Sequence, residues 1–205
     1  MYIAIEGIDG CGKDTQLERL YQHFKAMSSP CLLVTEPGDG PISDVLRSDF
    51  LKTGRCPKAH HALFLASRMV SVTEQVVPFE AQNPTATVLS SRSLASTLTY
   101  QQKYHALEYL IQCHKMLPRA PDLIILLDIP PELSIQRIQE RGRAIEYYET
   151  LSTLTWVRNR YLELMDNELF KEAFPDTKMI VISGVGNEDE VFNRILGEIN
   201  NETSG

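Results

Sequence analysis

The sequence lacks several features that would place it in other classes of protein. Only four of its 205 residues are cysteine, and none of the four forms a CxxC pair, so neither a disulfide scaffold nor a zinc module is indicated. No apolar run approaches the roughly 20 residues of a membrane-spanning helix, and no secretory signal pattern precedes the first predicted strand. The formal net charge of −7 argues against unspecific binding to duplex DNA, which needs a broad positive field. We expect a cytoplasmic protein that binds neither nucleic acid nor membranes.

Short apolar strands alternate with helical patterns along the whole chain. The strand patterns lie at 2–6, 31–35, 87–91, 123–128 and 179–183, and the helical patterns at 13–27, 41–53, 59–82, 95–116, 131–142, 150–172 and 188–200. Residues 123–128 are apolar on both faces, as in a central parallel strand. This alternation predicts one three-layer α/β/α domain over residues 1–205, with a parallel sheet and right-handed crossovers. We expect the tail at 201–205 to be frayed.

A glycine-rich stretch follows the first predicted strand and precedes the first predicted helix. Residues 7–13 read GIDGCGK, which fits the phosphate-binding pattern G-x-x-x-x-G-K in its proper context. Glycines let backbone N–H groups surround an anion, the helix N-terminus adds about half a positive charge, and the lysine reaches the β- and γ-phosphates. The predicted phosphate-binding residues are Gly7, Asp9, Gly10, Cys11, Gly12, Lys13, Asp14 and Thr15.

One position in this stretch departs from the pattern. The residue after the lysine is normally a Ser or Thr that contacts Mg²⁺, and here it is Asp14, followed by Thr15. A carboxylate is a good Mg²⁺ ligand, so Asp14 is a candidate for the metal directly or through water, with Thr15 as the other candidate. The alternative is that Asp14 only complements the helix dipole.

Five segments, in order over about residues 1–165, resemble the motifs of thymidylate kinases. EGIDGCGK at 6–13 resembles E-G-x-D-G-x-G-K-[ST], and TEPGDG at 35–40, with Arg47 further on, resembles R-E-P-G-G-T…R. LFLASR at 63–68 resembles L-F-x-A-x-R, and SRSLASTLTYQ at 91–101 resembles D-R-Y-x-x-S-S-L-A-Y-Q. The stretch from Leu127 to Gly142 resembles L-D-x-x-P-E…R-x-x-R-G. The resemblance implies a P-loop kinase fold with five parallel strands in the order 2-3-1-4-5 and a short LID at about 141–150.

The resemblance also implies an acceptor site for a nucleoside monophosphate. Phe64 stacks on the thymine ring and Arg68, one helical turn later, donates to a base carbonyl. Asp9 binds the sugar 3′-hydroxyl, and Tyr100 crowds the 2′ position. The remaining acceptor candidates lie beside the base edge, the monophosphate or the sugar: Glu36, Arg47, Arg92, Ser96, Thr97 and Gln101. Glu36 is also a weak metal candidate.

The catalytic charges are expected from two places. The phosphate loop carries no arginine between Asp9 and Gly12, so the chain resembles those family members that supply one from the LID. The LID candidates are Arg137, Arg141 and Arg143, because an arginine that closes over the site neutralises charge on the phosphoryl group being transferred. The resemblance also implies that Arg137 and Arg141 lie near the adenine. The predicted catalytic set is Asp9, Lys13, Arg92, Arg141 and Arg143.

Two departures from the family pattern suggest one exchange. Ser91 stands where the family has Asp, and Asp14 stands where it has Ser or Thr. Both family positions face the Mg²⁺ region, so we hypothesise that one carboxylate has moved from the third strand to the phosphate loop without changing the local charge.

These patterns together predict an ATP- and Mg²⁺-dependent kinase of thymidine 5′-monophosphate (dTMP) or a close pyrimidine analogue. The alternatives are a deoxynucleoside kinase, because SRS at 91–93 and the stretch after Arg143 resemble that class with Glu36 as base, and a non-catalytic nucleotide-binding protein. The apolar surface of the 59–82 helix and the family resemblance favour a homodimer. The sequence leaves open whether dTMP, dUMP or a 5-substituted dUMP is preferred.

Overall fold

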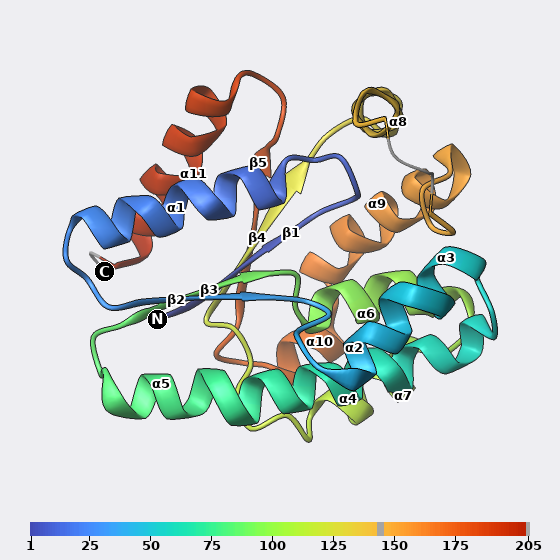
Figure 1. The fold of residues 1–205 in the computed structure, drawn as a ribbon, viewed down its shortest axis with the longest axis horizontal. Helices are drawn as coiled ribbons and strands as arrows, with labels where there is room; N and C mark the ends of the chain where they lie inside the picture. Colours follow the sequence, from blue (N-terminus) through green and yellow to red (C-terminus); the bar gives the residue numbers. More distant parts are fainter. Residues whose placement is uncertain (143–145, 204–205) are drawn as a thin grey trace.

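The computed structural model describes residues 1–142 and 146–203, which fold around a five-stranded sheet (Figure 1). The strands pair in the order β2-β3-β1-β4-β5, and every pairing is parallel. Their bounds are Tyr2–Glu6 (β1), Cys31–Thr35 (β2), Thr87–Ser91 (β3), Leu123–Asp128 (β4) and Lys178–Ser183 (β5). The predicted fold class and strand order are confirmed.

Helices cover both faces of the sheet and make the outer layers. On one face α1 (Lys13–Ala26) lies beside α11 (Glu188–Thr203), and on the other lie α4 (His60–Ser71), α5 (Val77–Gln82), α6 (Leu94–Tyr100) and α7 (Leu107–His114) (Figure 1). The remaining helices are α2 (Pro41–Val45), α3 (Leu51–Thr53), α8 (Pro131–Glu140), α9 (Leu151–Met165) and α10 (Glu168–Ala173). Within the described ranges no helix has the length and apolarity that a bilayer crossing needs.

The core lies where the central strands meet the helices. Every residue of β1 is buried, and β4 is buried from Leu123 to Leu127, whereas the edge strands β2 and β5 are only partly covered. Continuous apolar strands are what a sheet covered on both faces requires. Because all the strands run the same way, their carboxyl ends meet at one edge, and the polar residues that follow β1, β2 and β3 gather there.

Two of the predicted helices are each divided in the structure. The helix predicted at 95–116 ends at Tyr100, continues as a 3₁₀ turn (Gln101–Lys103), and resumes only at Leu107 after extended backbone at Ala106. The helix predicted at 150–172 ends at Met165, and α10 begins afresh because the Asn167 side chain accepts a hydrogen bond from the N–H of Phe170. Asn is among the strongest helix N-caps, so this break had a signal in the sequence.

The other helical predictions hold with local differences. The predicted segments 41–53 and 59–82 are helical, and each contains a π-helical turn, Leu46–Phe50 and Val72–Val76; the second also begins with the 3₁₀ turn Pro57–Ala59. The tail expected to fray from 201 instead continues the last helix to Thr203. The last two residues, 204–205, lie outside the described residues.

Candidate active site

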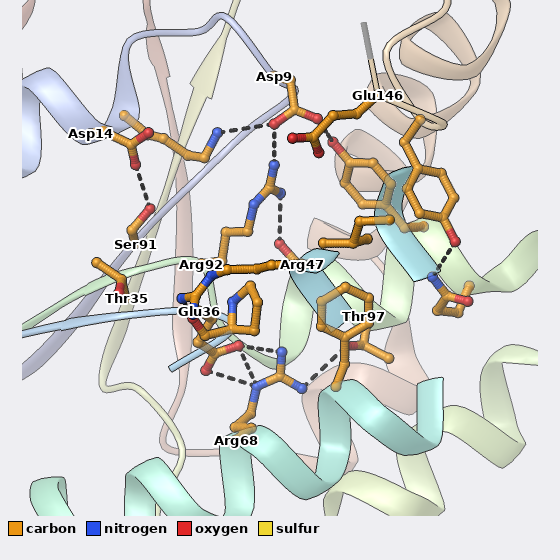
Figure 2. A pocket seen from close by; sticks show the side chains of 18 of the residues that line it. Asp9, Asp14, Thr35, Glu36, Arg47, Arg68, Ser91, Arg92, Thr97 and Glu146 are labelled. Atoms are coloured by element: carbon orange, nitrogen blue, oxygen red, sulfur yellow. Dashed lines mark hydrogen bonds and ion pairs between the residues drawn. The ribbon is translucent and has the colours of Figure 1, made fainter. Parts of the chain in front are cut away.

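A cavity of about 410 Å³ opens at the carboxyl ends of β1, β2 and β3, beside the loop that joins β1 to α1 (Figure 2). Ligands of open parallel sheets bind at this edge. Twelve residues that were predicted from the sequence line it: Asp9, Lys13, Asp14, Glu36, Arg47, Phe64, Arg68, Arg92, Ser96, Thr97, Tyr100 and Gln101. Seven others line it as well: Thr35, Pro37, Leu51, Ser91, Glu146, Tyr148 and Glu149.

The glycine-rich loop is held in place by close backbone contacts. Gly7 has a φ of +144°, and a Cβ there would lie 2.7 Å from the carbonyl oxygen of Leu127 in β4. Gly10 has a φ of +80°, and its Cβ would lie 2.8 Å from the carbonyl oxygen of Ser134 in α8. Only glycine fits either position without movement of the neighbouring backbone. The loop therefore owes its shape to contacts that side chains would prevent.

The start of α1 offers its N–H groups to the cavity side. Gly12 precedes the helix in a left-handed conformation, and no side chain caps the helix start. The first N–H groups of a helix lack partners within the helix and attract anions together with the helix dipole. Lys13 is buried, lines the cavity, and places its Nζ 3.4 Å from Asp9 Oδ1. Cys11 of the loop is buried.

Asp9 lies in the phosphate loop and contacts residues of the cavity outside it. Its carboxylate pairs with Arg92, lies within 3.4 Å of the Lys13 ammonium, and accepts a hydrogen bond of 3.3 Å from the Tyr100 hydroxyl. Burial alone would raise the pKa of Asp9, but the positive charges of Arg92 and Lys13 outweigh burial and hold that pKa well below its usual range. Asp9 is therefore ionised and able to accept a further hydrogen bond from a hydroxyl group.

Two arginines face the cavity near this carboxylate. Arg92 donates to Ser96 Oγ at 3.0 Å, and its guanidinium lies 5.2 Å from the centre of the Tyr100 ring. Arg47 is exposed and donates to the carbonyl oxygen of Pro37. Guanidinium groups suit phosphate because two of their N–H groups can bind it at once. Both arginines line the cavity, so both are candidates to bind an anionic group there.

Arg68 uses all five of its N–H groups within the protein. Its Nε donates to Glu36, Nη2 to Glu36 and to the carbonyl of Ser93, and Nη1 to Thr97 Oγ1 at 3.1 Å and His114 Nε2 at 2.8 Å. In this arrangement Arg68 has no free N–H group with which to make the hydrogen bond to a base carbonyl that the sequence predicted. Among the described residues nothing accepts the Thr97 hydroxyl hydrogen, so Thr97 has a donor available for a base.

Glu36 is the main hydrogen-bond acceptor for Arg68. Its side chain is 5% exposed, and both carboxylate oxygens accept hydrogen bonds from Arg68. Burial raises the pKa of Glu36, while Arg68 opposes that rise. A carboxylate held on both oxygens by one guanidinium is poorly placed to bind a metal or to act as a base, so the geometry favours a role in holding Arg68.

Apolar and aromatic side chains line part of the cavity. Phe64 lies one turn before Arg68 in α4, and Pro37, Leu51 and Tyr148 line the cavity with it. An aromatic ring beside a few fixed polar groups is the usual composition of a site for a flat ring. The cavity thus has a charged end and an apolar end.

The two residues of the hypothesised exchange are in direct contact. Ser91 Oγ donates to Asp14 Oδ1 at 2.6 Å (Figure 2). No described Lys or Arg pairs with Asp14, and no group of three His, Cys, Asp or Glu side chains among the described residues is arranged for a metal. Mg²⁺ in phosphate sites needs only one or two carboxylates, because phosphates and water complete its shell. Asp14 fits that role, whereas Thr15 is exposed and lies outside the lining.

The predicted LID arginines have separate positions. Arg137 lies against the phosphate loop, with Nη1 3.3 Å from the carbonyl oxygen of Gly10. Arg141 is exposed and pairs with the buried carboxylate of Glu149. Arg143 lies outside the described residues. Neither Arg137 nor Arg141 lines the cavity, so their catalytic and adenine roles stay predictions.

The described residues at the end of the predicted LID line one side of the cavity. Tyr147 lies over Gly54, where a Cβ would come within 2.2 Å of its ring, and its hydroxyl lies 2.9 Å from that of Tyr104. Tyr148 contacts His60 through its hydroxyl at 2.6 Å. Glu146 lies on the cavity side near Asp9 (Figure 2). The adjacent tyrosines, Tyr147 and Tyr148, were the sequence signal that this segment packs against the rest of the domain.

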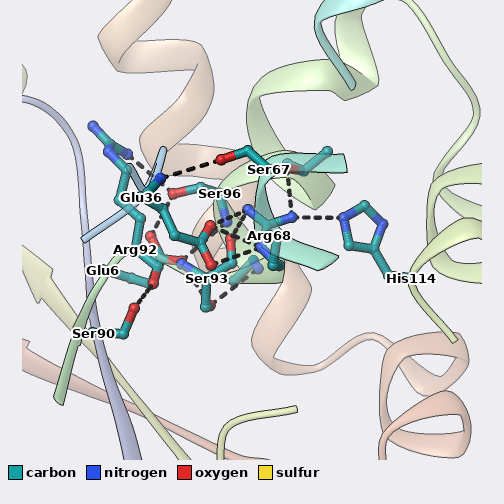
Figure 3. A network of polar contacts seen from close by, with 12 residues as sticks. Glu6, Glu36, Ser67, Arg68, Ser90, Arg92, Ser93, Ser96 and His114 are labelled. Atoms are coloured by element: carbon teal, nitrogen blue, oxygen red, sulfur yellow. Dashed lines mark hydrogen bonds and ion pairs between the residues drawn. The ribbon is translucent and has the colours of Figure 1, made fainter. Parts of the chain in front are cut away.

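A buried polar network beneath the cavity was missed from the sequence (Figure 3). Its members include Glu6, Ser93, His114 and Tyr161, all fully or almost fully buried. They come from β1, the turn before α6, α7 and α9, so no local sequence pattern connects them. The one available signal was Glu6, an acidic residue that ends an apolar strand.

A parallel sheet of this strand order, with a G-x-x-x-x-G-K loop between β1 and α1, defines a P-loop kinase. The family model for thymidylate kinase matches residues 5–186. A probable thymidylate kinase of Pyrococcus abyssi is 33% identical over all of this chain and 98% of its own length. Thymidylate kinases of Geotalea daltonii (33% identity, 97% of this chain, 98% of its own length) and Xylella fastidiosa (32%, 96%, 89%) are similar over comparable spans. The chain belongs to the thymidylate kinase family.

Proposed function

We propose that the chain transfers the γ-phosphoryl group of ATP to dTMP, giving ADP and dTDP. The observation that carries the proposal is one cavity in which Lys13 and the start of α1 lie across Asp9 from Arg92 and the apolar wall around Phe64. Such a cavity has room for two anionic groups at one end and a flat ring at the other. The names of the relatives and the family membership support the same reaction.

The described residues divide the work of binding. Lys13 and the first N–H groups of α1 bind the β- and γ-phosphates of ATP. Arg92 and Arg47 hold the monophosphate of the acceptor, and Asp9 accepts a hydrogen bond from the 3′-hydroxyl of its sugar. Phe64 stacks on the base, and Thr97 donates to the base edge.

The reaction requires positioning more than base catalysis. An oxygen of the dTMP phosphate attacks the γ-phosphorus, the new O–P bond forms, and the bond to the bridging oxygen of ADP breaks. The attacking oxygen is already anionic, so no proton needs to be removed from it. The arginine and lysine charges act on the transferring group, and Arg141 or Arg143 completes them from the LID. When Mg²⁺ is bound it neutralises phosphate charge, and Asp14, aligned by Ser91, is the residue that would hold it.

A coupled assay of ADP release tests the proposal. We expect turnover with dTMP, with dUMP and 5-substituted dUMP as the next-best acceptors, and little with dCMP or thymidine. Turnover with thymidine that exceeds turnover with dTMP would contradict the proposal and favour the nucleoside kinase alternative. Tight ATP binding without turnover of any acceptor would favour the non-catalytic alternative.

The geometry around Glu36 argues against the nucleoside kinase alternative. That reaction needs a free carboxylate to take a proton from a 5′-hydroxyl, and Arg68 occupies both oxygens of Glu36. The monophosphate acceptor needs no such base, and the arginines near Asp9 suit its charge.

We further propose a cytoplasmic homodimer. The α4–α5 segment exposes Val70 and Val77, which supports the predicted apolar contact surface. Light scattering coupled to gel filtration tests the oligomeric state, and a mass of one chain across the micromolar range would contradict it.

A further inference from the structure

Arg92 has a backbone conformation that arginine rarely adopts. Its φ is +72°, in the left-handed region where a Cβ is strained. Three hydrogen bonds hold the turn: Arg92 N–H to the carbonyl of Ile5 at 3.0 Å, Ser90 Oγ–H to the carbonyl of Arg92 at 2.6 Å, and Ser93 N–H to Glu6 Oε1 at 2.7 Å. Residues in such conformations persist when their surroundings fix them, and they cluster at functional sites.

Glu6 is the centre of this restraint. Its carboxylate is fully buried and receives five hydrogen bonds, from the N–H and hydroxyl of Ser93, the N–H and hydroxyl of Ser96, and the hydroxyl of Tyr161 (Figure 3). All five donors are neutral, and no ion pair involves Glu6 within the described residues. Neutral donors replace water around this carboxylate, which would otherwise be costly to bury.

The same carboxylate also reaches the Arg92 side chain through one hydroxyl group. Ser96 Oγ donates to Glu6 Oε2 at 2.7 Å and accepts from Arg92 Nη1 at 3.0 Å. The other end of the Arg92 guanidinium pairs with Asp9. Glu6 thus fixes Arg92 twice, through the turn that carries its backbone and through the hydroxyl that receives its side chain.

Glu6 has no contact with the cavity itself. It does not line the cavity and has no exposed surface, so a substrate does not touch it. Any effect of Glu6 on the reaction must pass through the groups that it holds.

We propose that Glu6 is a positioning residue that aims Arg92 at the phosphate of the acceptor. The proposal rests on the proposed function, because it takes a nucleoside monophosphate as the ligand of Arg92. It assigns Glu6 no part in binding the base or the sugar, so loss of Glu6 weakens binding of the phosphate group alone.

Calorimetric binding of dTMP and of thymidine separates this role from general damage. Glu6→Gln puts an amide NH₂ against groups that are all donors. We expect the affinity for dTMP to fall about tenfold to a hundredfold, the loss of roughly one charged hydrogen bond, while the affinity for thymidine changes by less than about twofold. Equal losses for the two ligands would overturn the proposal.

The variant Glu6→Gln/Arg92→Ala closes a double-mutant cycle. If Glu6 acts through Arg92, removing Glu6 after Arg92 costs less than about threefold in dTMP affinity, because the group that it positions is already absent. Losses that multiply would show that Glu6 acts by another route and would overturn the proposal.

Asp122→Asn is the matched control, and Tyr161→Phe is the milder variant. Asp122 accepts hydrogen bonds from Tyr2 N–H and from Arg119 at the opposite end of the central strands, so this acid-to-amide change should leave the ratio of dTMP to thymidine affinity unchanged. Should Glu6→Gln not fold, Tyr161→Phe keeps the carboxylate but removes one of its donors. It should lower dTMP affinity about threefold with thymidine affinity unchanged, and an unchanged ratio in this variant would overturn the proposal.

The wild-type measurements report separately on the proposed function. If the wild type binds and phosphorylates dTMP while Glu6→Gln keeps the wild-type ratio of affinities, only the role of Glu6 is overturned. If the wild type does not bind dTMP, the proposed function itself is overturned.

Discussion

The phosphate loop and the acceptor end of the cavity are built in opposite ways. The loop relies on backbone shape, with glycines at contacts of 2.7 and 2.8 Å that a Cβ would occupy and a helix start that no side chain caps. The acceptor end relies on paired charged side chains, the buried pair of Arg68 with Glu36 and the half-buried pair of Arg92 with Asp9, and serine and threonine hydroxyls bond to both arginines. The proposed phosphate site thus depends on local chain conformation, whereas the proposed acceptor site depends on tertiary packing.

The largest expected effect comes from the lysine of the phosphate loop. Lys13→Ala should lower kcat/KM by about a thousandfold, because the transferring phosphoryl group loses its nearest fixed cation. Lys13→Arg is the control that keeps the charge but changes its geometry. Steady-state kinetics with ATP and dTMP measure the effect, and a loss below about tenfold for Lys13→Ala would contradict the role given to this lysine.

The loop should also fail when its backbone shape is changed. Gly7→Ala adds a Cβ against the Leu127 carbonyl at a φ of +144°, and we expect ATP affinity to fall about a hundredfold. Gly197→Ala in α11 is the matched control, because nothing lies within 4 Å of its Cβ position and alanine favours a helix by about 0.5–1 kcal/mol. Equal ATP affinity in the two variants would show that the loop tolerates side chains.

At the acceptor end, Phe64→Ala should act on the base and not on the phosphate. We expect dTMP and thymidine affinities to fall together, by about thirtyfold, as stacking and apolar contact are lost. The parallel loss contrasts with the selective loss expected for Glu6→Gln. Calorimetry with both ligands measures it, and a change confined to dTMP would mean that Phe64 does not contact the base.

The Asp14–Ser91 contact joins the two regions, and its variants test the hypothesised exchange. Asp14→Ser should lower activity about tenfold and raise the Mg²⁺ concentration needed for half-maximal rate, because a metal carboxylate is removed. Asp14→Ser/Ser91→Asp should recover part of both losses, since it returns a carboxylate to the position whose hydroxyl lies 2.6 Å from Asp14 Oδ1 in the wild type. No recovery in the double variant at matched Mg²⁺ would count against the exchange.

The smallest expected effect at neutral pH comes from His114, at the far end of the acceptor network. Burial and the Arg68 charge lower the pKa of His114 to about 3. An unfolded chain takes up a proton on this histidine below about pH 6.5 while the folded chain does not, so stability falls as the pH falls from 6.5 towards 3, by up to about 1.4 kcal/mol per pH unit. His114→Gln should flatten this dependence, measured as the free energy of unfolding in urea between pH 7 and 4. Identical slopes for the two proteins would contradict the lowered pKa of His114.

The contrast between the regions also explains what the sequence could predict. The loop was readable because its chemistry lies in one contiguous run between a strand and a helix. The predicted acceptor residues come from separate segments, so only the order of the family motifs indicated them. The sequence could not predict that the N–H groups of Arg68 would be occupied by Glu36, Thr97 and His114. His114 lies in a helix 46 residues from Arg68, and no local rule connects them. The broken helix at 104–106 was missed because apolar spacing continues across it.

Ser93 has a consequence for how this site can change over generations. Its N–H and hydroxyl serve Glu6, beneath the phosphate end, and its carbonyl serves Arg68, beneath the base end. A movement of the backbone at Ser93 would therefore alter the surroundings of Glu6 and of Arg68 together. A change in base preference that moves this turn would therefore also change the affinity for the phosphate group.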